Sequence, residues 1–144
     1  MIGAVVVVAA LTGCGVFVNE FAEGDYAETI PEALLEADLA ITDAFASKGL
    51  DGFTAYLAVG IDIDQTELSE QALADMLRIV VNENDLPADQ MLLTVQNVEG
   101  DFIDLGQMVE RIAPDVGTNY VRDVDLTITT DEAREIVEAV DRQR

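Results

Sequence analysis

Histidine and tryptophan are absent from this 144-residue chain, and cysteine occurs once. Without histidine, the sequence offers no imidazole base for a nucleophile and no imidazole ligand for zinc. A single cysteine cannot form an intramolecular disulfide, so a folded domain must be stabilised by burial of apolar surface. The G-x-S-x-G, P-loop and G-x-G-x-x-G motifs are also missing, and we expect no cofactor. An enzyme of this composition would depend on carboxylate, Tyr, Ser, Lys or Arg side chains.

Basic side chains are scarce as well. Seven Lys and Arg residues stand against 29 Asp and Glu residues, which gives a net charge of −22, and all of these residues follow position 14. This charge repels nucleic acid and anionic headgroups, so we expect neither as a partner. The composition suits a salty or exposed environment and is equally typical of a halophilic protein and of an acidic secreted one.

The first 13 residues, MIGAVVVVAALTG, carry no charged side chain and lead directly to the single cysteine, Cys14. An apolar segment of this size is typical of the core of a secretory signal peptide. Leu11, Thr12, Gly13 and Cys14 resemble the lipobox of bacterial lipoproteins, in which a branched residue, a small residue and Gly or Ala precede the lipidated cysteine. The resemblance implies that the Cys14 thiol receives a diacylglyceryl group and that cleavage occurs just before it. The mature protein would then be held by lipid at the extracytoplasmic face of the cell membrane.

Two other interpretations of this region remain open. The uncharged run continues through Val18 and so reaches 18 residues. A helix of that length spans about 27 Å, which is near the minimum for crossing a bilayer. An uncleaved N-terminal membrane helix would therefore replace the lipid anchor. In the other interpretation Cys14 is simply a small buried residue.

The sequence predicts a signal peptide over residues 1–13, a short stem over residues 14–29 and a single α/β domain over residues 30–144. A helix is predicted from Pro31 to about Gly49, because apolar residues recur there at helical spacing. Residues 53–63 alternate between apolar and polar side chains, which is typical of a half-exposed strand. Residues 91–98 and 121–129 predict two further strands.

Three capping-box spacings predict where the remaining helices begin. The pairs are Asp64 with Glu67, Asp104 with Gln107, and Thr129 with Glu132. The predicted order is therefore α-β-α-β-α-β-α. Because two of the strands have one polar side, we expect a two-layer sandwich with a small three-stranded sheet and helices mainly on one face. The predicted core residues are Leu57, Val59, Ile61, Leu77, Val95, Val109, Leu126, Ile128 and Val137.

Two groups of carboxylates are candidates for a cation site. The first contains Asp62, Asp64 and Glu67, but the spacing departs from an EF-hand loop, and a solvent-facing residue and a helix cap account for it. The second, in the loop EGDFID, contains Glu99, Asp101 and Asp104, with Phe102 and Ile103 as anchors into the core. A turn followed by a capping Asp accounts for this group. We therefore expect no metal site and no catalytic residue, and Cys14 is the only site residue predicted.

Other side chains suggest binding. Arg78, Arg111 and Arg134 fall in the middle of three predicted helices, and one hypothesis is that they share an anion site. Acidic neighbours such as Asp75 and Glu138 favour surface ion pairs instead. Tyr56 is the tyrosine that the pattern places on the polar side of a strand. An exposed Tyr on a half-bare sheet acts either in recognition or in cross-strand packing.

These observations favour a membrane-anchored lipoprotein with a small acidic, non-catalytic domain that binds an envelope component or a ligand. The alternative is a carboxylate-dependent extracytoplasmic enzyme, such as a polysaccharide hydrolase. That enzyme needs a pocket with two acids about 5 to 10 Å apart.

The excess negative charge predicts that salt stabilises the folded domain. Repulsion among carboxylates acts over about 30 Å at 0.01 M salt and over only about 3 Å at 1 M. A fragment that begins near Gly24 should therefore unfold at a higher temperature in moderate NaCl than in low salt, and KCl should act equally. Thermal melts measure this, and an unchanged unfolding temperature would refute the repulsion argument.

Calcium distinguishes general screening from a specific site. If the acidic groups belong only to turns and helix caps, millimolar Ca²⁺ at matched ionic strength should not raise the unfolding temperature further. A calcium increment that Asp62→Asn or Asp101→Asn abolishes would overturn this expectation.

Overall fold

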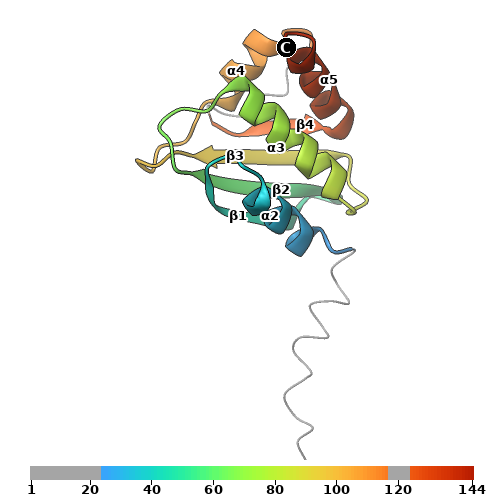
Figure 1. Ribbon diagram of the computed structural model, residues 1–144. Coiled ribbons are helices and arrows are strands. Elements are labelled where there is room, and N and C mark those ends of the chain that lie inside the picture. Colours follow the sequence, from blue (N-terminus) through green and yellow to red (C-terminus); the bar gives the residue numbers. More distant parts are fainter. Residues whose placement is uncertain (1–23, 117–123) are drawn as a thin grey trace, which may run out of the picture.

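The computed structural model describes residues 24–116 and 124–144 (Figure 1). The predicted signal peptide, the lipobox, most of the stem and the start of the third predicted strand lie outside these residues. The elements in chain order are α2 (Tyr26–Glu36), β1 (Ile41–Asp51), β2 (Thr54–Ile63), α3 (Glu70–Glu83), β3 (Gln90–Gln96), α4 (Leu105–Ile112), β4 (Leu126–Thr129) and α5 (Thr130–Asp141).

The four described strands form one mixed sheet in the order β1-β2-β3-β4. β1 is antiparallel to β2, β2 is parallel to β3, and β3 is antiparallel to β4. Helix α3 makes the crossover between the two parallel strands. The predicted α/β class is confirmed, whereas the predicted three-stranded sheet is wrong, because a hairpin replaces one predicted helix–strand connection.

That hairpin corrects the prediction of a helix from Pro31 to Gly49. Helix α2 ends at Glu36, and residues 41–51 form strand β1 instead. The two-residue turn at Gly52 and Phe53 joins β1 to β2, and Gly52 has the positive φ of 63° that such a turn favours. Phe53, the first residue of the strand predicted over residues 53–63, lies at this turn instead and is 107% exposed.

Two of the three predicted helix caps are confirmed. Asp104 accepts a hydrogen bond from the Gln107 amide at 2.9 Å, and Thr129 accepts one from the Glu132 amide at 3.1 Å. The third prediction is wrong, since α3 is capped by Ser69, whose Oγ accepts from the Ala72 amide at 3.1 Å. The preceding residues form a loop.

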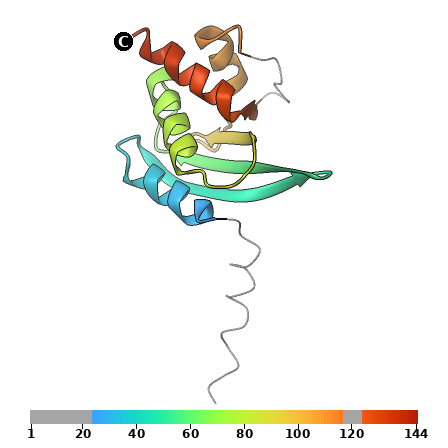
Figure 2. The same cartoon turned by 90° about the vertical axis from the view of Figure 1, so that its right-hand side faces the viewer.

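Helices α2, α3 and α5 lie on one face of the sheet, and α4 lies beside α5 toward the β4 side (Figures 1 and 2). The core fills the space between the helices and this face. Every predicted core residue is buried except Val137, which is partly buried against the core. The alternation of β2 was therefore assigned to the correct faces.

The described part of the domain begins at residue 24, two residues before α2. Tyr26, within the segment predicted as the stem, starts α2 and is only 4% exposed. Asp25 is the N-cap residue, but its side chain makes no capping bond. The carboxylate of Asp85, from the loop after α3, accepts from the amides of Asp25 and Tyr26 at 2.6 and 2.9 Å. Gly24 has a positive φ of 113°, which favours glycine, and a Cβ there would also displace the same carboxylate.

Replacing Asp85 with Ala should therefore destabilise the domain by roughly 0.5 to 2 kcal/mol, the usual cost of losing an N-cap acceptor. Urea unfolding of the variant measures this. Asp89→Ala is the matched control, because it removes the same charge from the same loop and leaves the bond from the Thr130 amide to the main-chain carbonyl of residue 89 in place. Equal losses in the two variants would show that charge, and not capping, is responsible.

Candidate functional site

The face of the sheet opposite α2, α3 and α5 is named here the open face. Strand alternation and register place its residues, since directly paired residues point to the same side. They are Asp43, Phe45, Ser47, Gly49 and Asp51 of β1, Thr54, Tyr56, Ala58, Gly60 and Asp62 of β2, Gln90, Leu92, Thr94 and Gln96 of β3, and Thr127 and Thr129 of β4. The face is polar at most positions, as predicted, but its middle is apolar.

Two aromatic rings lie across neighbouring strands on this face. Phe45 is paired with Gly60, and a Cβ on Gly60 would collide with the Phe45 ring. Tyr56 is paired with Gly49 in the same way. Each glycine thus leaves room for the ring opposite it, and Phe45 remains 59% exposed. The interpretation of Tyr56 as a residue on the outer side of a strand is consistent with this arrangement.

A shallow hollow of about 290 Å³ adjoins Tyr56 at the hairpin end of the sheet. Its lining combines apolar side chains with hydrogen-bonding groups. The residues are Leu50, Asp51, Tyr56, Gln90, Met91, Leu92 and Thr127. Leu50 is 67% exposed, but its pairing with Ala55 places it on the same side of the sheet as Lys48 and Leu57, so it is not part of the open face.

Carboxylates flank the apolar middle of the open face. Asp43 of β1 and Asp62 of β2 are paired directly and are both exposed, and Asp51 lies at the other end of β1. Like charges placed opposite each other on a sheet are destabilising. Lys48, the basic residue of β1, is paired with the fully buried Leu57 and therefore belongs to the helix-covered face.

The first acidic group of the sequence is divided between elements. Asp62 lies on the open face, whereas Asp64 and Glu67 are exposed in the loop before α3. In that loop the Asp64 amide donates a hydrogen bond to the carbonyl of Ala40. Within residues 24–116 and 124–144, no three His, Cys, Asp or Glu side chains are grouped to hold a metal ion.

The second acidic group lies in a turn organised by Asn97. The Asn97 side-chain oxygen accepts from the amides of Glu99 and Asp101 at 3.0 and 2.9 Å. Asp104 caps α4, as described above. Phe102, predicted as a core anchor, is 53% exposed, so that prediction is wrong, whereas Ile103 does pack against the core.

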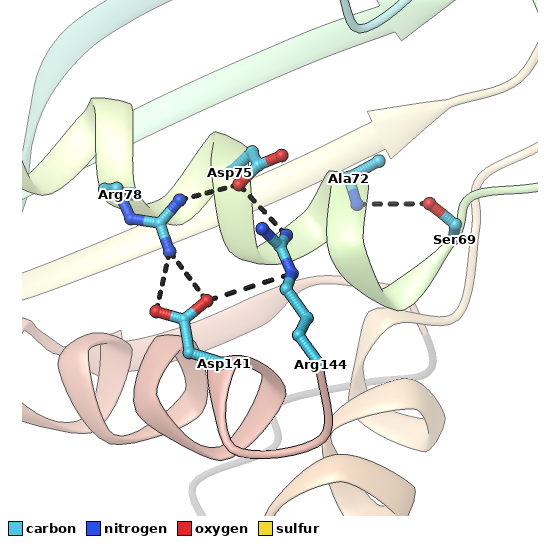
Figure 3. Close-up of polar contacts among 6 residues, drawn as sticks. All are labelled: Ser69, Ala72, Asp75, Arg78, Asp141 and Arg144. Carbon is cyan, nitrogen blue, oxygen red and sulfur yellow. Dashed lines mark hydrogen bonds and ion pairs between the residues drawn. The ribbon is translucent and has the colours of Figure 1, made fainter.

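Arg78 joins α3 to the end of α5 in an ion-pair network (Figure 3). Its guanidinium contacts Asp75 at 2.7 Å and Asp141 at 2.9 Å, and Arg144 contacts Asp75 at 3.3 Å. The hydrogen bond to Asp141 is the main cause that raises the pKa of Arg78. Two arginines and two aspartates balance each other, so the network is structural.

Arg134 pairs with Asp131 at 2.9 Å and not with the predicted Glu138. A hollow of about 260 Å³ brings together Arg78 and Arg134, and its lining does not include Arg111. The three arginines predicted to share an anion site are therefore not assembled there, and the two that meet already have aspartate partners.

Three hollows on the described part of the molecule each have one acidic lining residue. These residues are Asp51 in the hollow at the hairpin, Glu138 in the hollow between α3 and α5, and Asp89 in one of about 480 Å³ beside the start of α5. None of the three hollows holds the pair of carboxylates that a glycosidase uses.

Sequence reasoning missed Phe45, Gly49 and Gly60 as parts of one surface. Gly52 was the available signal, because a glycine at the first central position of a two-residue turn between two runs of strand-forming residues favours a hairpin. The register that follows from this turn places each ring opposite its glycine.

No helix among the described residues has the length and apolar character needed to cross a membrane. Comparisons of the chain with protein families, with curated proteins and with solved structures find no match.

Proposed function

We propose that the protein is a membrane-anchored extracytoplasmic lipoprotein whose acidic α/β domain is a non-catalytic binding module. The lipobox-like residues Leu11 to Cys14 support the anchor. The open face supports the binding role, because it carries the exposed ring of Phe45 beside the half-buried ring of Tyr56, and covering exposed apolar surface with a partner lowers the free energy. This feature is the observation on which the binding role depends.

The anchor and the domain are close in the chain. Gly24 follows Cys14 by ten residues, and ten extended residues reach at most about 35 Å. The domain would therefore stay near the membrane and meet partners within the envelope. Its net charge would keep it from lying flat on anionic headgroups.

The hydrolase alternative has weaker support. A glycosidase holds two acids about 5 to 10 Å apart around its substrate. Each of the three hollows of the described domain supplies one acidic residue. The geometry therefore favours binding without catalysis.

Replacing Cys14 with Ser tests the anchor. The variant should lose all incorporation of labelled fatty acid and should move from the membrane fraction to a soluble or unprocessed form, because the hydroxyl does not replace the thiol that is acylated. Metabolic labelling and cell fractionation measure both effects. The Asp85→Ala variant, which keeps Cys14, is the control and should retain the label.

Unchanged labelling of the Cys14→Ser chain would contradict the proposed lipid anchor. Membrane association that persists without any fatty-acid label, in the variant and in the parent chain, would instead identify an uncleaved N-terminal helix.

A further inference from the structure

We infer that the open face of the sheet is the docking surface for a partner protein that presents an extended segment rich in Arg or Lys. The inference rests on the proposed binding function and adds the location and the chemistry of the partner. Three observations support the inference. Phe45 and Tyr56 lie in the middle of this face, carboxylates lie at its ends, and the described basic residues lie elsewhere.

The middle of the surface is apolar and partly exposed, with Phe45 exposed and Tyr56 half-buried. Phe45 lies over Gly60 and is 59% exposed, Tyr56 lies over Gly49, and Leu92 on β3 is partly exposed. Rings of this kind bind both apolar side chains and guanidinium or ammonium groups, the latter through the negative potential of the ring face. The surface therefore accepts a segment in which apolar and cationic side chains occur together.

The ends of the surface are negative. Asp43 and Asp62 face each other across β1 and β2, two positions along from Phe45 and Gly60. Their mutual repulsion is relieved when a cation lies between them. Asp51 is the last residue of β1, at the opposite end of the surface from Asp43, and it lines the hollow beside Tyr56.

The separation of these charges favours a polypeptide over a small cation. Asp43 and Asp51 are eight residues apart on one strand, which corresponds to about 26 Å. A metal ion or a simple amine reaches one end only. An extended segment of about the same length contacts both ends and the aromatic middle.

The described basic residues do not compensate this surface. Lys48 belongs to the opposite face, and the remaining ones lie on α3, α4, α5 or just after α5. A second copy of the chain would bring the same net charge of −22 and would be repelled. An uncharged apolar partner would cover the aspartates without pairing them, which carries a desolvation cost.

The test uses the full-length chain in neutral detergent and a fluorescent synthetic peptide of the length of β1. On one side of the extended peptide, Arg occupies the end positions and Val the positions between them. Fluorescence anisotropy gives the affinity, and amide chemical shifts of the ¹⁵N-labelled chain locate the contact. Peptide binding in this assay does not depend on whether Cys14 is acylated. A wrong prediction of the lipid anchor and a wrong prediction of docking would therefore give different results.

Two pairs of variants separate docking from general attraction. Asp43→Asn/Asp62→Asn is compared with Glu110→Gln/Glu135→Gln, which removes two exposed charges from α4 and α5. Phe45→Ser is compared with Leu35→Ser, which removes a 46% exposed apolar side chain from α2. Circular dichroism checks that all variants remain folded.

We expect the two open-face variants to weaken peptide binding by about tenfold or more, with little change in their controls. Shifts should be confined to β1, β2 and β3. Equal weakening in both charge variants, or shifts spread over α3 to α5, would overturn the inference in favour of general attraction. Equal binding of a peptide with Ser in place of Arg, concentration-dependent self-association through this face, or no binding at all would overturn it as well.

Discussion

The register between β1 and β2 is the constraint on which both faces of the sheet depend. It places Leu57, Val59 and Ile61 under the helices and, by the same alternation, leaves Phe45 and Tyr56 on the other side. A slip of one residue would exchange the two sets and expose the core. The turn at Gly52 fixes this register locally, and the glycines opposite the two rings fit only the observed pairing.

Much of the fold was accessible from local sequence. The alternation of β2 and the caps of α4 and α5 depend on neighbouring residues, and those predictions are confirmed. β1 was missed because its inward positions include Ala44, Ala46 and Lys48, so alternation gives almost no contrast in hydrophobicity. Ile41 and Phe45 stand four apart and imitate a helix face.

The open face was less accessible, because it depends on pairing between strands. Tyr56 was recognised as an outward residue from its own strand. The match of Phe45 with Gly60, and of Asp43 with Asp62, exists only once the hairpin register is known. The distribution of charge also depends on tertiary structure, because Arg78 and Arg144 pair with aspartates of the helix layer. These two arginines therefore do not neutralise the strand carboxylates.

The attachment of Asp85 to the start of α2 also determines how the domain bears mechanical load. A pull on the segment before Gly24 enters the fold at the amides of Asp25 and Tyr26, which the Asp85 carboxylate holds. Part of the force passes to the loop after α3 and part to the buried ring of Tyr26. Because α2 packs against both β1 and α3, tension at this point would reach the edge strand that carries Phe45 as well as the helix layer. If the segment before Gly24 were under load, strain there would thus be coupled to the shape of the exposed sheet.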